Sequence, residues 1–84
     1  MAQTPSDEYA AILGKVFKNA RERAGLSQKK LSEISGVGRT GIITLESAQR
    51  NPSILIVQML ADGMGVQLSD LIAAVEKEWK KRKK

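Results

Sequence analysis

Residues 27–53, SQKKLSEISGVGRTGIITLESAQRNPS, carry the pattern that decides the fold. Two short segments flank a turn, and each has two apolar residues three positions apart: Leu31 with Ile34, and Ile42 with Leu45. Gly36 stands where the first segment must stop, because glycine adopts positive φ without strain. Val37 follows it and can fill the corner between two helices. The stretch therefore predicts a helix-turn-helix, a motif typical of DNA-binding proteins.

The whole chain is expected to be all-α, because helical spacing of apolar residues continues on both sides of this stretch. Five helices with short connections are predicted, at Asp7 to Ala24, Gln28 to Ser35, Arg39 to Ser47, Ile54 to Asp62 and Leu68 to about Lys80. The length of 84 residues suits one small domain. We expect a flexible N-terminus at residues 1–6, the domain with a dimerising C-terminal helix at 7–79, and a basic tail at 80–84.

Several short fragments of the sequence carry a family resemblance. They are GLSQ from Gly25, SGV from Ser35, RNPS from Arg50 and MGVQLSDLI from Met64. Found in this order over about fifty residues, they resemble the phage-repressor and Cro-like helix-turn-helix regulators, often called the XRE family. The resemblance implies a compact five-helix bundle of the lambda-repressor-like DNA-binding type. The helix-turn-helix would then lie in its second and third helices.

The third predicted helix is the candidate recognition helix, which would enter the major groove by its N-terminal end. Once Ile42 and Leu45 are buried, its remaining face carries the candidate base-reading residues Arg39, Thr40, Ile43 and Thr44. Arginine can hold guanine O6 and N7 with two hydrogen bonds, and threonine offers a hydroxyl and a methyl group. All but Ile43 match the family's base-reading positions. Ile43 either touches a thymine methyl group or is a partly exposed apolar residue.

The start of the second predicted helix carries candidate contacts with the DNA backbone. Ser27 is a good N-cap, but Lys30 occupies the capping-box position of an acid, and Lys29 beside it is also positive. Two cations at the positive end of a helix are unfavourable alone, whereas a docked phosphate would stabilise them. The alternative is two ordinary surface lysines. By resemblance, further backbone contacts fall to Gln28, Arg50 and Asn51.

Arg21 and Glu46 are a candidate ion pair between the first helix and the end of the third. They match a pair of the family, and both side chains are expected to be partly buried. Such a pair would fix the angle of the recognition helix, although its net contribution to stability is small. The alternative is two unrelated surface charges.

Small residues make the recognition helix differ from the family's usual pattern. Gly38 takes the place of a hydroxyl N-cap, and Gly41 lies inside the helix, where glycine costs about 0.5–1 kcal/mol relative to alanine. Ala48 stands where the family often has a glycine that ends the helix. The helix is therefore expected either to be soft when free of DNA or to let its backbone approach the DNA closely.

The last two predicted helices carry more apolar residues than one small bundle requires. In the fourth helix, four residues satisfy the core: Ile54, Val57, Leu60 and Ala61. The surplus suggests a homodimer, because a two-fold partner buries the same patch on both subunits. The predicted dimer interface consists of Leu55, Ile56, Met59, Val75 and Trp79. The alternative is that Val75 and Trp79 fold back on the first helix near Tyr9.

Composition excludes several classes of function. The chain has no cysteine and no histidine, and its acidic residues form no recognisable dyad or metal-ligand spacing. We therefore expect no enzyme activity, no metal site and no cofactor. No apolar run is long enough to span a membrane and no signal peptide is recognised, so a cytoplasmic protein is expected. The five basic residues from Lys80 onward account for the net charge of +5, because nine basic and nine acidic residues balance elsewhere.

Together these observations predict a sequence-specific DNA-binding transcriptional regulator, with repression as its direction. It would bind a two-fold symmetric operator in double-stranded DNA as a homodimer, through the major groove. One alternative is an antitoxin that holds a toxin on its surplus apolar surface, and another is a restriction-modification controller protein of the same fold. A further alternative is a protein-interaction module that does not read DNA. The basic tail is either a solvated end or an arm that attracts phosphates.

Overall fold

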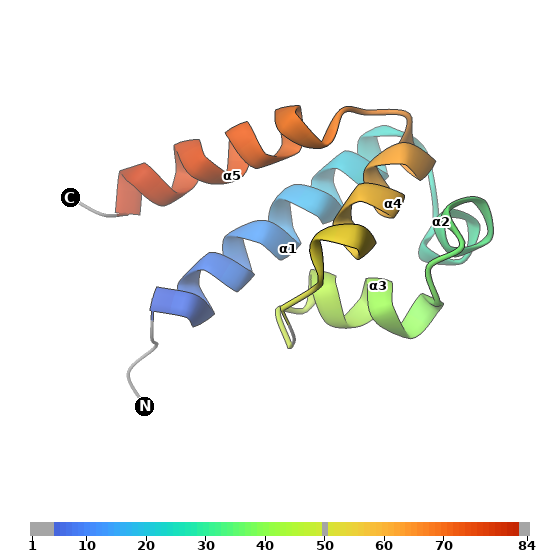
Figure 1. Cartoon of the computed structure of the whole chain (residues 1–84), viewed down its shortest axis with the longest axis horizontal. Helices are drawn as coiled ribbons and strands as arrows, with labels where there is room; N and C mark the ends of the chain where they lie inside the picture. Colours follow the sequence, from blue (N-terminus) through green and yellow to red (C-terminus); the bar gives the residue numbers. More distant parts are fainter. Residues whose placement is uncertain (1–4, 50, 83–84) are drawn as a thin grey trace.

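The computed structural model describes residues 5–49 and 51–82, whose backbone forms five helices joined by short turns (Figure 1). The helices are α1 (Pro5–Arg23), α2 (Gln28–Ser35), α3 (Arg39–Glu46), α4 (Ile54–Met64) and α5 (Leu68–Arg82). No strand occurs within these two ranges, and the predicted all-α class is confirmed. α5 runs alongside α1 in the opposite direction, α3 also packs on α1, and α2 packs on α3 and α4.

Both terminal helices extend beyond their expected limits. α1 begins at Pro5, two residues before the expected start, and α5 continues to Arg82, two residues past the expected end. Proline is favoured in the first turn of a helix, and cations are favoured in the last turn, where the helix dipole is negative. Parts of the expected flexible N-terminus and basic tail are therefore helical. The remainder of each segment lies outside the described residues.

Side-chain caps set the limits of α2 and α4. The Ser27 hydroxyl accepts the backbone N–H of Lys30 at 3.0 Å, and Gly36 ends α2 with a φ of 79°. The Ser53 hydroxyl accepts the N–H of Ile56 at 3.2 Å at the start of α4. The predicted caps at Ser27 and Gly36 are confirmed, so the helix-turn-helix begins and turns where the sequence indicates.

The core draws one fully buried large side chain from every helix: Phe17, Leu31, Ile42, Leu60 and Val75. Two residues expected in the core are exposed instead. Ile34 is 51% exposed, because Gly63 of α4 approaches α2 at Ser35, and the buried line of α2 therefore runs through Leu31 and Ser35. Ile54 is 73% exposed because it is the first residue of α4, while Val57 begins that helix's buried face.

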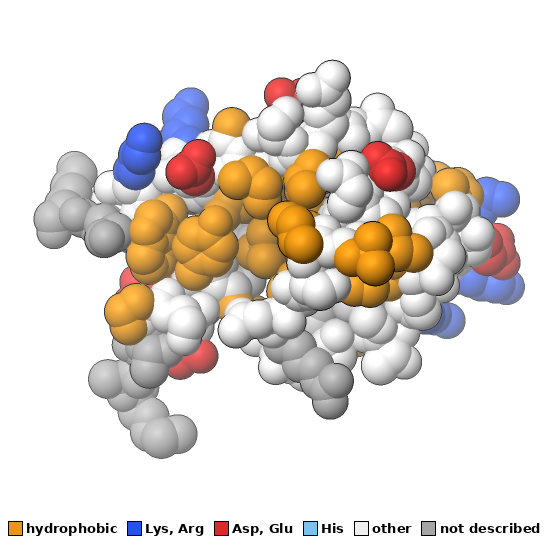
Figure 2. Space-filling model, viewed as in Figure 1, with side chains coloured by type: hydrophobic (Ala, Val, Ile, Leu, Met, Phe, Trp, Pro, Cys, Tyr) orange, Lys and Arg blue, Asp and Glu red, His pale blue; other side chains and the backbone are white. Residues whose placement is uncertain are grey.

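The apolar stripe of α5 is covered within the chain. Val75 has no exposed surface, so its predicted place in a dimer interface is wrong, because it cannot reach a second copy. Trp79 packs edge-on against Tyr9, with ring centroids 5.3 Å apart and an interplanar angle of 72°. The alternative that α5 folds back on α1 is confirmed. Figure 2 shows the apolar side chains in a band that runs from the seam between these helices toward α4.

Candidate DNA-binding surface

The corner between α2 and α3 is held by one apolar side chain and two serine hydroxyls. Val37 is only 3% exposed, which confirms that it fills the corner. The Ser32 hydroxyl donates to the carbonyl of Val37 at 2.6 Å, and the Ser35 hydroxyl accepts its N–H at 3.1 Å. Both polar backbone groups of the turn residue are thus paired, so the angle between α2 and α3 is well defined.

The outer face of α3 presents the predicted base-reading residues together. Ile42 and Leu45 point into the core, whereas Arg39 and Thr40 are exposed and Ile43 is 41% exposed. Thr44 is half-buried, and its hydroxyl donates to the carbonyl of Gly41 at 3.1 Å, which keeps the hydroxyl oxygen available as an acceptor. The four side chains therefore form one surface, and their contacts with bases remain a prediction.

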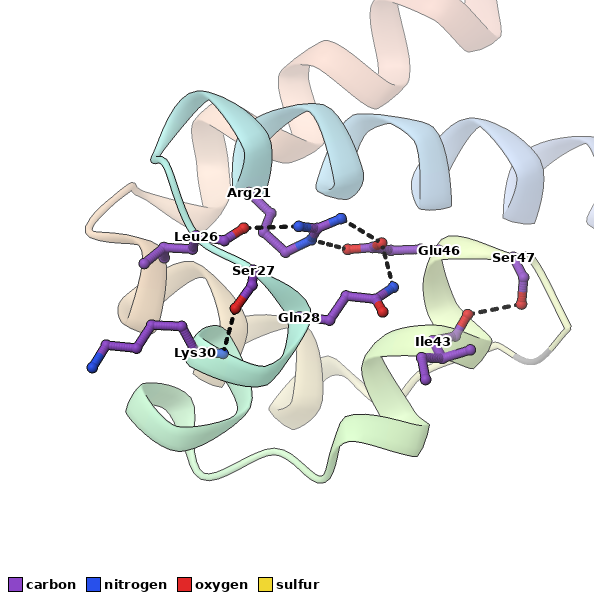
Figure 3. A network of polar contacts seen from close by, with 8 residues as sticks. All are labelled: Arg21, Leu26, Ser27, Gln28, Lys30, Ile43, Glu46 and Ser47. Carbon is purple, nitrogen blue, oxygen red and sulfur yellow. Dashed lines mark hydrogen bonds and ion pairs between the residues drawn. The ribbon is translucent and has the colours of Figure 1, made fainter.

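The predicted ion pair anchors the C-terminal end of α3 to α1 (Figure 3). Arg21 donates from Nε to Oε2 of Glu46 at 2.7 Å and from Nη2 to Oε1 at 3.1 Å. Its Nη1 donates to the carbonyl of Leu26 at 2.8 Å. The two side chains are 10% and 7% exposed, and the hydrogen bond with Glu46 raises the pKa of Arg21. The Arg21–Glu46 prediction is confirmed, and both ends of the pair have further partners.

Gln28 belongs to the same network, which sequence reasoning did not find. Its Nε2 donates to Oε1 of Glu46 at 3.0 Å, so the first residue of α2 is tied to the last residue of α3 (Figure 3). Lys29 and Lys30 are exposed, and the Lys30 side chain points away from the network. The Gln28 side chain is thus engaged with Glu46, and the DNA-backbone contact of Gln28 stays a prediction.

Gly14 also positions α3, and sequence reasoning missed it. A Cβ atom at this position would lie 2.5 Å from the carbonyl oxygen of Leu45 and 2.9 Å from that of Glu46. Only a glycine allows the backbones of α1 and α3 to approach this closely. The available signal was a glycine in the middle of a predicted helix, a position where its lower helix propensity usually has a packing reason.

The residues after α3 continue the surface toward α4. Ala48 takes a left-handed φ of 60°, and the N–H of Gln49 donates to the carbonyl of Thr44 at 2.9 Å, so the helix ends as it would with a glycine. Asn51 is exposed and shares a shallow cavity of about 170 Å³ with Thr44. Arg50, the other predicted backbone contact here, lies outside the described residues.

The described residues contain neither a cluster of metal ligands nor a single helix suited to span a membrane. Across residues 5–49 and 51–82, no three His, Cys, Asp or Glu side chains gather where they could hold a metal ion. Within the same ranges, no single helix has both the length and the apolar composition to cross a membrane. α4 and α5 satisfy these criteria only as a pair, and the pair is bent by 112°.

Sequence comparison places the protein in a family. The model of the helix-turn-helix family matches residues 17–71, and the chain belongs to this family, in its phage-repressor and Cro-like (XRE) branch. The regulator PuuR of Escherichia coli (strain K12) is 36% identical over 72 residues, which are 86% of this chain and 38% of that protein. Control protein C.MunI of a Mycoplasma species is 31% identical over 64 residues, 76% of this chain and 86% of that protein. The chain thus spans about two fifths of PuuR but most of C.MunI.

Solved structures of controller proteins share the fold. The restriction-modification controller protein C.AhdI from Aeromonas hydrophila superposes with a TM-score of 0.71 and 29% identity, over 74% of this chain and 94% of that one. The controller C.Esp1396I, solved as a tetramer in complex with its natural 35 base-pair operator, gives a TM-score of 0.77 and 25% identity. That match covers 84% of this chain and 93% of that one. The predicted five-helix bundle is confirmed.

Proposed function

We propose that the protein is a sequence-specific DNA-binding transcriptional regulator. This function rests on the way α3 is held in the fold. Its outer face is exposed, while Arg21 and Gln28 bind Glu46 at its C-terminal end and Gly14 lets α1 pack against the same end. A helix held in this way can enter the major groove as a rigid element. The family membership and the operator complex of C.Esp1396I support the same function.

In this proposal α3 reads bases and its surroundings bind phosphates. The Arg39 guanidinium would hold a guanine, while Thr40 and Thr44 offer oxygen atoms and methyl groups to neighbouring bases. Ile43 would contact a thymine methyl group. Backbone contacts would come from the N-terminus of α2 with Lys29 and Lys30, and from the segment at Arg50 and Asn51. Such a regulator acts on the chromosome, so we place it in the cytoplasm.

The first prediction separates base reading from phosphate binding. Arg39→Ala should weaken the best site by about 1–3 kcal/mol and relax one base preference, because it removes the one long cation of the outer face of α3. Lys29→Ala is the matched control, and it should weaken all sequences to a similar degree. Selection of bound fragments from random DNA measures both. An unchanged base preference after the loss of Arg39 would contradict this docking.

We also propose that the protein binds a two-fold symmetric operator as a homodimer. Leu55 is 64% exposed, and Ile56 and Met59 are half-buried beside it on α4, so this helix keeps an apolar surface that residues 5–49 and 51–82 do not cover. Trp79 contributes only what its packing on Tyr9 leaves exposed. The tetramer of C.Esp1396I on its operator supports assembly of such domains on DNA.

The second prediction tests this assembly. Leu55→Lys should produce monomers, because an unpaired lysine in an apolar interface is costly. Affinity for paired half-sites about 34 Å apart should then fall by at least tenfold, since linked recognition helices bind together. Ala73→Lys, the same charge on an exposed position of α5, is the control. Sedimentation measures the oligomeric state of both variants. If Leu55→Lys remains a dimer, the dimer contact lies elsewhere.

A restriction-modification controller is the second candidate function. The controllers C.MunI, C.AhdI and C.Esp1396I are 31%, 29% and 25% identical to this chain, and the two solved ones share its fold. Sequencing of the genomic DNA that the protein binds separates the two. Binding ahead of restriction and modification genes indicates a controller, and binding elsewhere indicates a regulator of other genes. A small protein that co-purifies with the chain would indicate the antitoxin alternative, and the absence of binding to any DNA would indicate an interaction module.

A further inference from the structure

A groove between α1 and α5 gathers positive charge from both helices. It has a volume of about 410 Å³, and five basic residues line it: Lys15, Arg23, Lys77, Lys81 and Arg82. Glu78 is the one acidic residue in its lining, and it is already paired with Lys81 at 3.6 Å. Five positive charges against one negative charge give the groove a net charge of +4, whereas the other described residues have six basic and eight acidic side chains.

This distribution differs from the one expected from the sequence. The charge run from Lys80 onward was expected to be a separate tail, but α5 continues to Arg82 and brings Lys81 and Arg82 beside α1. They line the same groove as Lys15 and Arg23, which lie about sixty residues earlier in the sequence, with Arg23 toward the opposite end because the two helices are antiparallel. Like charges brought together by folding repel one another, so a ligand of opposite charge would stabilise this arrangement.

The floor of the groove is apolar and identifies the kind of ligand. This floor consists of the four apolar residues among the eleven that line the groove: Ala11, Ile12, Val16 and Ala74. A DNA phosphate backbone could use the cations but would bury nothing on such a floor. A protein segment with acidic residues on both sides of an apolar stripe would pair with the cations and cover the apolar floor at the same time. Along α1, the roughly 18 Å from Ala11 to Arg23 corresponds to a helix of about 12 residues.

The groove faces away from the DNA-binding surface. Successive residues of a helix are rotated by roughly 100°, so Lys15, Asn19 and Arg23 lie roughly 100–180° around α1 from Gly14. Gly14 is the residue that contacts the end of α3. A ligand in the groove and a duplex on α3 would therefore occupy opposite sides of α1.

We propose that the α1–α5 groove is a docking site for an acidic, amphipathic helical segment of a partner protein, separate from the DNA-binding surface. The inference does not depend on the DNA-binding function, because it concerns other residues. A regulator with this site could hold a partner protein and DNA at the same time. The cations would attract and orient the segment, and its apolar residues would cover the floor of the groove.

A designed peptide of about 16 residues tests the proposal, with leucines on one helical face and glutamates beside them. Titrated into the full chain, it should shift the backbone amide NMR signals of Ala11, Asn19 and Ala74. Lys15→Glu/Lys77→Glu should weaken its binding at least tenfold, because two attractions become repulsions. The matched control is Lys18→Glu/Lys80→Glu, which makes the same charge change on the same helices outside the groove lining, and it should change binding less than threefold.

A second variant separates the apolar floor from simple charge attraction. Ala11→Lys adds a positive charge but places a long side chain on the floor, so it should weaken the peptide about tenfold if the floor is used. A peptide of the same composition with its leucines scrambled should bind at least tenfold more weakly. Equal binding of both peptides, equal effects of both charge-reversed pairs, or tighter binding by Ala11→Lys would overturn the proposal.

A non-specific 20 base-pair duplex tests whether the groove binds DNA instead. If the duplex shifts the same amide signals, and Lys15→Glu/Lys77→Glu abolishes its binding, the groove is a DNA surface and the proposal is overturned.

Discussion

The two ends of α3 are built in opposite ways. At the C-terminal end, Glu46 receives hydrogen bonds from Arg21 and Gln28, and Gly14 lets α1 approach the helix backbone. At the N-terminal end, Gly38 provides no side-chain cap, and Arg39 is exposed. The C-terminal end is anchored and fixes the direction of the helix, while the end that carries the proposed base-reading residue Arg39 has no side-chain cap. One short helix thus combines an anchored end with an uncapped end.

Removal of the carboxylate at the anchored end should have the largest effect. Glu46→Ala leaves the Arg21 guanidinium buried without its counter-charge, so the free energy of unfolding should fall by about 3–5 kcal/mol. Urea unfolding measures this change. Glu78→Ala is the control, because it breaks the exposed pair with Lys81 and should cost less than about 0.5 kcal/mol. Similar losses in the two variants would mean that the Arg21–Glu46 pair is no anchor.

The anchored end also shows what the sequence could predict. The partnership of Arg21 and Glu46 followed from a family resemblance, and the turn at Gly36 from the conformational freedom of glycine. The role of Gly14 did not follow, because spacing shows which face of a helix is apolar but not where another backbone crosses it. Gln28 was missed for a similar reason, since its partner lies 18 residues away and is fixed only by the packed corner.

The limits of hydrophobic patterns explain the remaining differences. Ile34 and Ile54 are apolar and helically spaced, yet they lie at the margins of their helices' buried faces and remain exposed. Val75 continues the stripe of α5, but periodicity alone could not say whether α1 or a second copy of the chain covers it. A pattern identifies a face, and only the three-dimensional arrangement decides what covers that face.

Crowding the close approach between α1 and α3 should have the next largest effect. In Gly14→Ala the new methyl group would press on the carbonyl oxygens of Leu45 and Glu46, so the free energy of unfolding should fall by about 2–3 kcal/mol. Gly41→Ala is the control, because its methyl group would meet a side-chain atom of Val37 at 3.3 Å and helix propensity improves. That variant should stay within about 1 kcal/mol of wild type. Equal losses would indicate that any helical alanine is tolerated poorly here.

The smallest expected effect comes from adding a side-chain cap at Gly38, which would make the N-terminal end of α3 more like its anchored C-terminal end. Gly38 has φ −58° and ψ 145°, a conformation that serine adopts readily, and no atom lies within 4 Å of a new Cβ. Gly38→Ser should therefore raise the free energy of unfolding by about 0.5 kcal/mol, by capping α3 and restricting the unfolded chain. Gly65→Ser is the matched control: its Cβ is equally unobstructed, but φ is +73°, so it should be destabilising by about 1 kcal/mol. If Gly38→Ser stabilises α3 yet weakens DNA binding, the uncapped end must adjust its conformation when it binds DNA. If DNA affinity rises together with stability, the missing cap only lowers stability, and recognition depends on the orientation that the Glu46 end gives to α3.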